Sequence, residues 1–246
     1  MSTVGNWRGP NIVKDGLVLY LDSGSPNSYY SLQGGNTWKD ISGNGNNGSL
    51  INGPTFNSAN GGSIVFDGTN DYVNFSLTIP TSTVYTVCCW FTAAAGNWNG
   101  SLFGFGTGTS PNTQNVYLFG GGGGCGSPAG GSFGFNTWNC DSYGIGNAST
   151  LLKNNGFHHV TAIFRNQSVN TNVLWLDGVP QTLSQQFGIT NNTSNLTNQF
   201  KIASNGWYVS DQLWRGSISL CQVYNRALSS TEIQQNFNAT KSRFGL

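Results

Sequence analysis

The acidic residues are the first candidates for chemistry in this sequence. Glycoside hydrolysis usually needs two carboxyl groups, one on each side of the bond that is cut. Glu232 is the only glutamate among the 246 residues. Five aspartates lie beside Gly or Asn turns or at the ends of apolar runs, namely Asp22, Asp40, Asp67, Asp71 and Asp177. Aspartates in such places cap turns through a side-chain oxygen, so no catalytic residue and no enzymatic activity are expected.

One turn groups hard oxygen donors as a calcium ion requires. The segment Asp67-Gly-Thr-Asn-Asp71 brings Asp67, Asn70 and Asp71 together. The alternative is a hydrogen-bonded hairpin turn that needs no metal. Calcium is the one cofactor that the sequence suggests. The two alternatives differ in outcome, because calcium removal lowers the melting temperature only if the ion is bound.

The histidines and cysteines form no recognisable metal site. His158 and His159 are neighbours on a predicted strand, so their rings point to opposite faces, one inward and hydrogen-bonded and one outward. The five cysteines lack a C-x-x-C pair, which argues against zinc. Free buried thiols are expected for Cys88 and Cys89. A Cys125–Cys140 bridge across a Gly-rich loop is the alternative for that pair.

Two glycine motifs are explained by turns and composition. The run from Gly43 to Gly48 matches G-x-G-x-x-G, but Asn-rich turn residues flank it and a strand follows, unlike in a dinucleotide site. Residues 130–134 match G-x-S-x-G around Ser132, in a stretch where Gly and Ser are abundant. A nucleophile elbow needs a strand–turn–helix context, which the surrounding residues do not predict.

Aromatic residues near predicted loops offer a different chemistry, because an exposed ring can stack on a sugar. Four such residues are Trp98, Trp207, Tyr208 and Trp214. The alternative for each of them is packing in the core or on a sheet.

The composition excludes several classes of protein. Charged residues are 8% of the chain and the net charge is +1, which leaves no electrostatic footprint for nucleic acid or for an anionic membrane. Aromatic residues are 13%, which is too many for a disordered chain. No apolar run approaches the roughly 20 residues of a membrane span. The first residues lack the apolar segment of a secretory signal.

Short apolar runs alternate with Gly, Asn and Ser clusters, which is typical of two packed β-sheets. The predicted strands are Leu17–Asp22, Ser49–Asn52, Ser63–Asp67, Tyr72–Phe75, Tyr85–Thr92, Ser101–Phe105, Val116–Phe119, Ser132–Trp138, Phe157–Arg165, Val173–Asp177, Gln199–Ala203 and Gly216–Tyr224. Asp-Gly pairs at Asp177 and Asp67 predict tight turns.

One helix is predicted near the C-terminus. Ser229-Ser-Thr-Glu232 is a capping box, in which Glu232 reaches back to the first residue. Ile233, Phe237 and Thr240 then fall on one face at helical spacing. The helix should end before Gly245.

Several segments taken together resemble the laminin-G-like domains of the concanavalin A-like superfamily. The segments that carry the resemblance are Asp15–Asp22, Trp38–Gly48, Ile64–Val73, Phe157–Val160, Leu174–Gly178 and Val223–Ser229. The resemblance implies an all-β fold, a jelly-roll sandwich of two antiparallel sheets with one short C-terminal helix. It covers residues 15–246 as a single domain and leaves residues 1–14 as an N-terminal arm, which we expect a partner or a neighbouring subunit to hold.

The segment from Tyr224 through the C-terminal Glu232–Leu246 resembles virion proteins of tailed bacteriophages that carry this domain. The resemblance implies a structural role on the virion surface, most simply as a capsid decoration or cement protein whose partners are capsid or tail proteins or further copies of itself. Glycanases of the superfamily carry paired glutamates on one strand, and this chain has none there. The alternative function is that of a carbohydrate-binding adhesin or a receptor-binding tail module, with glycans as partners.

Overall fold

Seventeen strands and two α-helices occur in the residues that the computed structural model describes, which are 11–29, 35–75, 84–96, 99–106, 113–119, 131–137, 142–152, 156–166, 169–188, 196, 199–205 and 212–246. The strands are β1 (Leu17–Asp22), β2 (Thr37–Trp38), β3 (Gly48–Ile51), β4 (Thr55–Asn57), β5 (Ser63–Asp67), β6 (Tyr72–Phe75), β7 (Val84–Phe91), β8 (Gly100–Gly106), β9 (Thr113–Phe119), β10 (Ser132–Thr137), β11 (Ser142–Gly146), β12 (His158–Arg165), β13 (Val173–Leu176), β14 (Val179–Pro180), β15 (Ser184–Phe187), β16 (Phe200–Ile202) and β17 (Arg215–Tyr224). The helices are α1 (Ala148–Leu152) and α2 (Ser230–Thr240), and the 3-10 turn Lys241–Phe244 follows α2.

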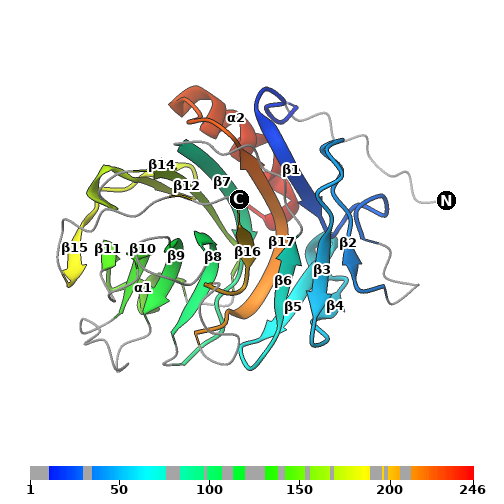
Figure 1. The fold of residues 1–246 in the computed structure, drawn as a ribbon, viewed down its shortest axis with the longest axis horizontal. Helices are drawn as coiled ribbons and strands as arrows, with labels where there is room; N and C mark the ends of the chain where they lie inside the picture. The colour runs from blue at the N-terminus through cyan, green and yellow to red at the C-terminus, as the bar shows by residue number, and fades with distance from the viewer. Residues whose placement is uncertain are drawn as a thin grey trace.

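The strands form two antiparallel sheets that face each other (Figure 1). Sheet A has the strand order β14-β13-β12-β7-β17-β5-β4, and β1 pairs with the C-terminal half of β17. Sheet B has the order β15-β11-β10-β9-β8-β16-β6-β3-β2. Strands that are distant in sequence, such as β7 and β17, are therefore neighbours in space. This arrangement confirms the jelly-roll sandwich that the sequence predicts.

Aromatic rings fill the space between the sheets. Phe105 of sheet B packs against Phe164 of sheet A, with ring centroids 5.3 Å apart and an edge-to-face angle of 78°. Phe135 meets the same ring of Phe164 at 5.3 Å and 87°. Edge-to-face pairs of this kind are favourable beyond the area that they bury. The core is thus built from the inward-facing residues of both sheets.

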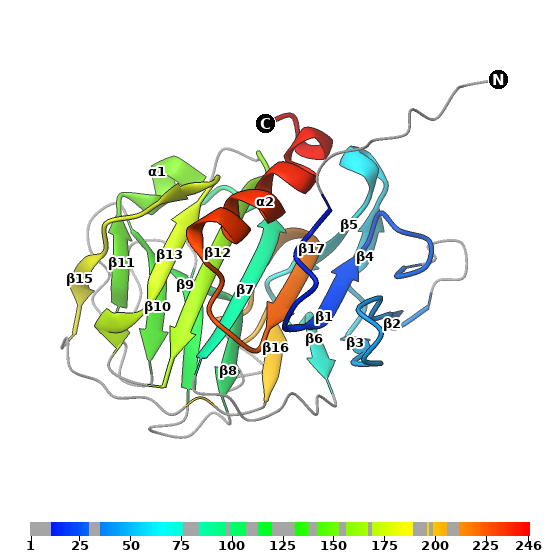
Figure 2. The same cartoon turned by 90° about the horizontal axis from the view of Figure 1, so that it is seen from above.

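The outer face of sheet A is covered by the C-terminal segment. Figure 2 shows α2 lying across β12, β7 and β17. Ile233 and Phe237 of α2 are buried there, as the helical spacing predicts. Ser229 accepts a hydrogen bond from the backbone of Glu232, and the Glu232 side chain bonds back to the backbone of Ser229, which confirms the capping box.

All twelve predicted strands are present, with ends that shift by at most a few residues. The elements that were not predicted are the short edge strands β2, β4, β14 and β15, strand β11 and the one-turn helix α1. These elements are only two to five residues long, and pairing with neighbouring strands rather than their own residues defines the strands among them. No helix in the described part of the chain has the length and apolar character needed to cross a membrane.

The two Asp-Gly turns have different roles. Asp177 and Gly178, both with positive φ, connect β13 to β14, and Leu176 pairs with Val179 across a two-residue hairpin. This confirms the turn predicted at Asp177. The turn at Asp67 is not a hairpin, because β5 belongs to sheet A and β6 to sheet B. It carries the chain from one sheet to the other. The local sequence does not show whether an Asp-Gly turn closes a hairpin or connects two sheets.

Candidate functional site

The aspartates of the turn after β5 accept hydrogen bonds from the backbone of the turn itself. Asp67 Oδ1 accepts from Thr69 N at 2.7 Å, and Asp71 Oδ2 accepts from Asp67 N at 3.2 Å. Burial, opposed by that backbone bond, raises the pKa of the Asp71 carboxyl, and the nearby Asp67 raises it further. The backbone oxygen of Asn70 accepts a bond from Asn52. These bonds complete the turn without a metal, although the turn is not the hairpin that was expected as the alternative, and calcium at Asp67, Asn70 and Asp71 is tested by the chelator experiment below.

The described residues hold no group of three or more His, Cys, Asp or Glu side chains arranged to bind a metal ion. The three cysteines that the structure describes, Cys88, Cys89 and Cys221, are buried free thiols. Burial raises the pKa of Cys88 to about 12, so this thiol stays protonated and unreactive near neutral pH. Cys125 and Cys140, for which a bridge was an alternative, lie outside the described residues.

Trp214 is part of the core and does not present a ring face to solvent. It is fully buried, its indole N–H donates to the backbone oxygen of Thr92 at 3.1 Å, and Phe91 meets it edge to face at 5.5 Å. A sugar needs an exposed ring on which to stack. The prediction that Trp214 binds a sugar is therefore wrong, and the alternative, packing in the core, is correct. The other three candidates, Trp98, Trp207 and Tyr208, lie outside the described residues.

Both histidines are buried, which corrects the expectation that one ring points outward to solvent. His158 faces the core side of β12, and its Nδ1 lies 2.8 Å from Asp177 Oδ2. His159 faces the other side, where Trp90 and Phe237 pack on its ring at 5.0 and 5.5 Å. Strand alternation was correct, but α2 covers the face that the sequence suggested would be exposed.

The remaining chemical candidates are structural. Arg226 binds both oxygens of Glu232, and this pairing, together with the bonds from Ser229, lowers the pKa of Glu232 to about 2. Ser132 lies within β10, buried, and shares a hydrogen bond of 2.9 Å with the hydroxyl of Ser142. The serine of the G-x-S-x-G match is therefore the first residue of a strand and not part of a nucleophile elbow.

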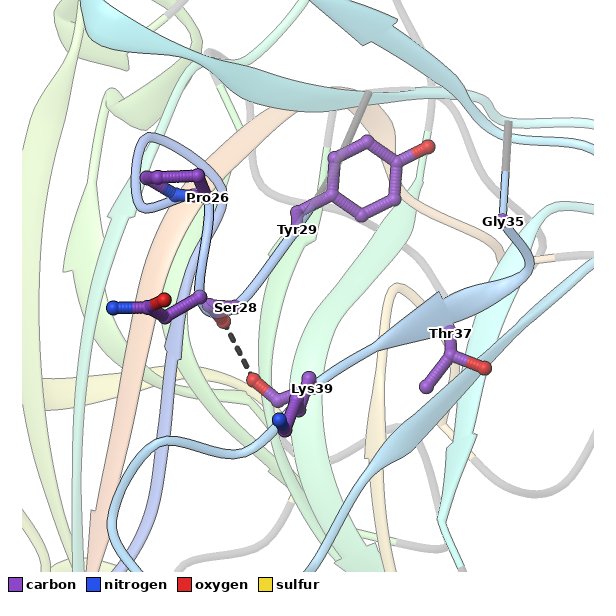
Figure 3. A pocket seen from close by; sticks show the side chains of 7 residues that line it. Pro26, Ser28, Tyr29, Gly35, Thr37 and Lys39 are labelled. Carbon is purple, nitrogen blue, oxygen red and sulfur yellow. Dashed lines mark hydrogen bonds between the residues drawn. The ribbon is translucent and has the colours of Figure 1, made fainter. Parts of the chain in front are cut away.

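A pocket of about 420 Å³ opens between the loop that follows β1 and the edge strand β2 (Figure 3). Its lining residues come from two stretches of chain and are mostly polar: Pro26, Asn27, Ser28, Tyr29, Gly35, Thr37 and Lys39. Strand alternation places Thr37 and Lys39 on the exposed side, while Trp38 between them is fully buried. No sequence motif marks these polar residues, so they are not among the predicted site residues.

Hydrogen bonds hold the two walls of the pocket together. Lys39 N donates to Ser28 O at 2.7 Å, and the Ser28 hydroxyl donates to Lys39 O at 2.6 Å. The same hydroxyl accepts from Asp22 N at 3.0 Å. Tyr29 stacks on Phe56 with centroids 5.4 Å apart, and burial raises the pKa of its phenol. The pocket is therefore preformed, as small-molecule sites usually are.

The two packed sheets define a lectin-like jelly-roll domain. A family model described as the concanavalin A-like lectin/glucanases superfamily (Laminin_G_3) matches residues 67–234, about two thirds of the chain. The chain belongs to this superfamily. The pocket precedes the matched residues. No curated protein sequence gives a significant match.

Solved structures with the same fold include proteins that act on or bind carbohydrate. One is domain 4 of AbnA, a GH43 extracellular arabinanase from Geobacillus stearothermophilus, in complex with arabinotriose; it has 14% identity and a TM-score of 0.55, over 90% of this chain and 98% of that domain. Another is Trypanosoma rangeli sialidase in complex with sialic acid, with 16% identity and a TM-score of 0.57 over 93% of this chain. This chain spans 33% of the sialidase. At these identities the likeness establishes the fold alone.

Proposed function

We propose that this protein is a non-enzymatic structural protein of a tailed-phage virion, acting as a capsid decoration or cement protein that docks on the shell. The observation that carries the proposal is the sequence resemblance of the segment from Tyr224 to Leu246 to phage virion proteins of this kind. In the fold this segment is an integral part of the domain. Arg243 joins it to Asp22 of β1 at 2.6 Å.

The state of the ionisable groups supports a non-enzymatic role. Glu232 is committed to the capping box and to Arg226, and His158 to Asp177. His159 is enclosed by aromatic rings, and burial lowers its pKa to about 4. Catalysis by acid and base needs such groups within reach of a substrate, and these groups face their own structural partners.

The copy number of the protein per particle tests the virion proposal. Particles would be purified from the source, and the protein quantified by mass spectrometry against the major shell protein. Hundreds of copies per particle are expected for a decoration protein. A handful of copies would replace the decoration role with a tail role, and absence from purified particles would overturn the virion proposal.

We also propose that the domain binds carbohydrate, and the pocket at β2 is the observation that favours this second function. Asn27, Thr37 and Lys39 offer hydrogen-bonding groups to a ligand, and Tyr29 adds an aromatic wall. The likeness to a domain solved with arabinotriose supports the choice of ligand class. The two proposals are compatible, because a protein on a virion surface can itself bind glycans.

A glycan panel tests the second function, with Thr37→Ala as the pocket variant. Thr55→Ala is a matched control, because Thr55 is also an exposed threonine at the start of a short edge strand and does not line the pocket. Binding that is weakened by Thr37→Ala and kept by Thr55→Ala would support the proposal. A blank panel would overturn it, and equal binding by both variants would move the site away from the pocket.

A further inference from the structure

The lining of the pocket at β2 includes a lysine that forms no ion pair with any carboxylate in the described part of the chain. Lys39 is the one charged residue among those that line the pocket. Two carboxylates are close to the pocket in sequence, those of Asp22 and Asp40. Asp22 Oδ1 binds Arg243 Nη1 at 2.6 Å and also accepts from Gly24 N at 2.9 Å.

The carboxylate of Asp40 is occupied in a different way. It is 5% exposed and accepts hydrogen bonds from Tyr20 N at 2.9 Å, Ser42 N at 2.8 Å and Asn46 N at 2.9 Å. The hydroxyl of Ser42 donates a further bond to it at 2.8 Å. Both carboxylates are therefore committed to folding contacts.

The other lysines in the described part of the chain have aromatic partners. Lys14, Lys201 and Lys241 lie over the rings of Tyr20, Tyr72 and Phe237, at 5.8, 5.3 and 5.4 Å from the centroids. Within the same described residues, the ammonium group of Lys39 contacts neither a carboxylate nor an aromatic ring. It is an exposed cation with three hydrogen atoms to donate.

The backbone of Lys39 is nevertheless fixed. The two hydrogen bonds between Lys39 and Ser28, at 2.7 and 2.6 Å, anchor the residue to the opposite wall of the pocket. The side chain therefore starts from a defined point, two residues after Thr37, in the lining of the pocket. The residues that line the pocket thus include one lysine, a threonine hydroxyl and an asparagine amide, and none of them is acidic.

We infer that this pocket selects an acidic sugar, one that carries a carboxylate or a sulfate group. The inference rests on the carbohydrate-binding function proposed above and names the ligand class for that site. The anionic group of the sugar accepts a charge-assisted hydrogen bond from Lys39 Nζ, which is stronger than a neutral one. Thr37 and Asn27 then bind sugar hydroxyls. Because the pocket is open to solvent, salt screens the charged contact.

The test compares pairs of oligosaccharides that differ only in charge. A uronic acid oligosaccharide is measured against its carboxyl-reduced, neutral counterpart, and a sulfated oligosaccharide against its desulfated form. The acidic member of a pair is expected to bind about tenfold more tightly at low salt, as one charge-assisted hydrogen bond would give. This preference should shrink as ionic strength rises. The pair with the larger preference identifies the anionic group.

Three variants connect the preference to Lys39. Lys39→Gln should remove the preference for the acidic sugar over its neutral counterpart, whereas Lys39→Arg should retain this preference. Lys241→Gln is the control for the loss of a lysine elsewhere, because Lys241 lies on the helix-covered side of the molecule against Phe237. Thermal melts of all three variants verify that each one is folded.

The outcomes separate this inference from the function on which it rests. Equal binding of acidic and neutral sugars, or a preference that survives Lys39→Gln, would overturn the inference while carbohydrate binding stands. Failure of every acidic and neutral sugar to bind would overturn both. A preference that is lost in Lys39→Gln and kept in the other two variants would support the inference.

Discussion

The helix-covered face of sheet A and the pocket edge of sheet B are built in opposite ways. On the helix-covered face, Trp90, His159 and Phe237 pack against one another, and Phe244 stacks on Trp90 at 4.1 Å. At the pocket edge, Thr37 and Lys39 are exposed and the walls are joined by hydrogen bonds between backbone and serine. The first region buries apolar area, and the second displays polar groups.

The helix-covered face therefore contributes mainly to the stability of the sandwich, and the pocket edge offers groups that a ligand can contact. Buried aromatic area contributes several kcal/mol per side chain. Exposed polar groups contribute little to folding and remain available to a ligand. Substitutions in the two regions should therefore have different consequences, and the predictions below are ordered from the largest expected effect on stability to the smallest.

Trp90→Ala should cause the largest loss. Trp90 is fully buried, stacks on Phe237 and Phe244, and donates its indole N–H to the hydroxyl of Thr240 at 2.8 Å. Its removal should lower the free energy of unfolding by about 3–5 kcal/mol, as measured by urea denaturation. A loss below about 1 kcal/mol would show that α2 does not depend on this contact.

Acidification should weaken the same face through His159. Burial lowers the pKa of His159 to about 4 from its ordinary value of 6.5, although Asp177 acts in the opposite direction. Between pH 6.5 and 4 the unfolded chain binds a proton that the folded chain excludes. The free energy of unfolding should therefore fall as pH is lowered through this window, by about 3 kcal/mol in full.

Urea denaturation at several pH values checks this slope. His159→Leu places a side chain that does not titrate under α2. The free energy of unfolding of this variant should therefore depend less on pH between pH 6.5 and 4. If the wild type and His159→Leu lose stability in parallel, other groups cause the slope.

Arg243→Lys should have an intermediate effect, because Arg243 anchors the covering segment at its end. Its guanidinium donates to Asp22 and Ser219 at 2.6 and 2.7 Å, and to the backbone oxygens of Asn60, Gly61 and Gly62. A lysine keeps the charge but cannot reproduce this fork of donors. The expected loss is about 2 kcal/mol. The exposed Arg215, replaced by lysine, serves as the control and should behave like the wild type.

Substitutions in the pocket should barely affect stability. Thr37→Ala and Lys39→Gln change side chains that are exposed to solvent, so the free energy of unfolding should change by less than about 0.5 kcal/mol in each variant. The comparison with Trp90→Ala is direct when all are measured by the same denaturation. A loss of more than about 1 kcal/mol from Thr37→Ala would mean that the pocket edge also holds the fold together.

A chelator should have the smallest effect. Asp67 and Asp71 already accept hydrogen bonds from the backbone of their own turn. We therefore expect the same melting temperature in calcium and in chelator. A melting temperature that rises with added calcium would instead establish the ion at Asp67, Asn70 and Asp71.

Much of the fold could be predicted because its signals are local. Turn residues interrupt the apolar runs, so the strand positions are visible in the sequence, and the cap at Ser229 marks the start of α2. The candidate site was much less predictable. Trp214 looked like a ligand-binding ring because it lies near a predicted loop, yet its partners Phe91 and Thr92 are more than 120 residues away in the chain.

By itself the sequence determined the all-β class, the strand positions, the capped helix and the hairpin at Asp177, because hydrophobic periodicity and turn chemistry act over a few residues. Only the tertiary structure decided that the chain changes sheets at Asp67, that α2 covers His159, and that Ser28 and Lys39 join to form a pocket. These features depend on contacts between segments that are not adjacent in the sequence. Their geometry is set by packing, which no local pattern of residues encodes.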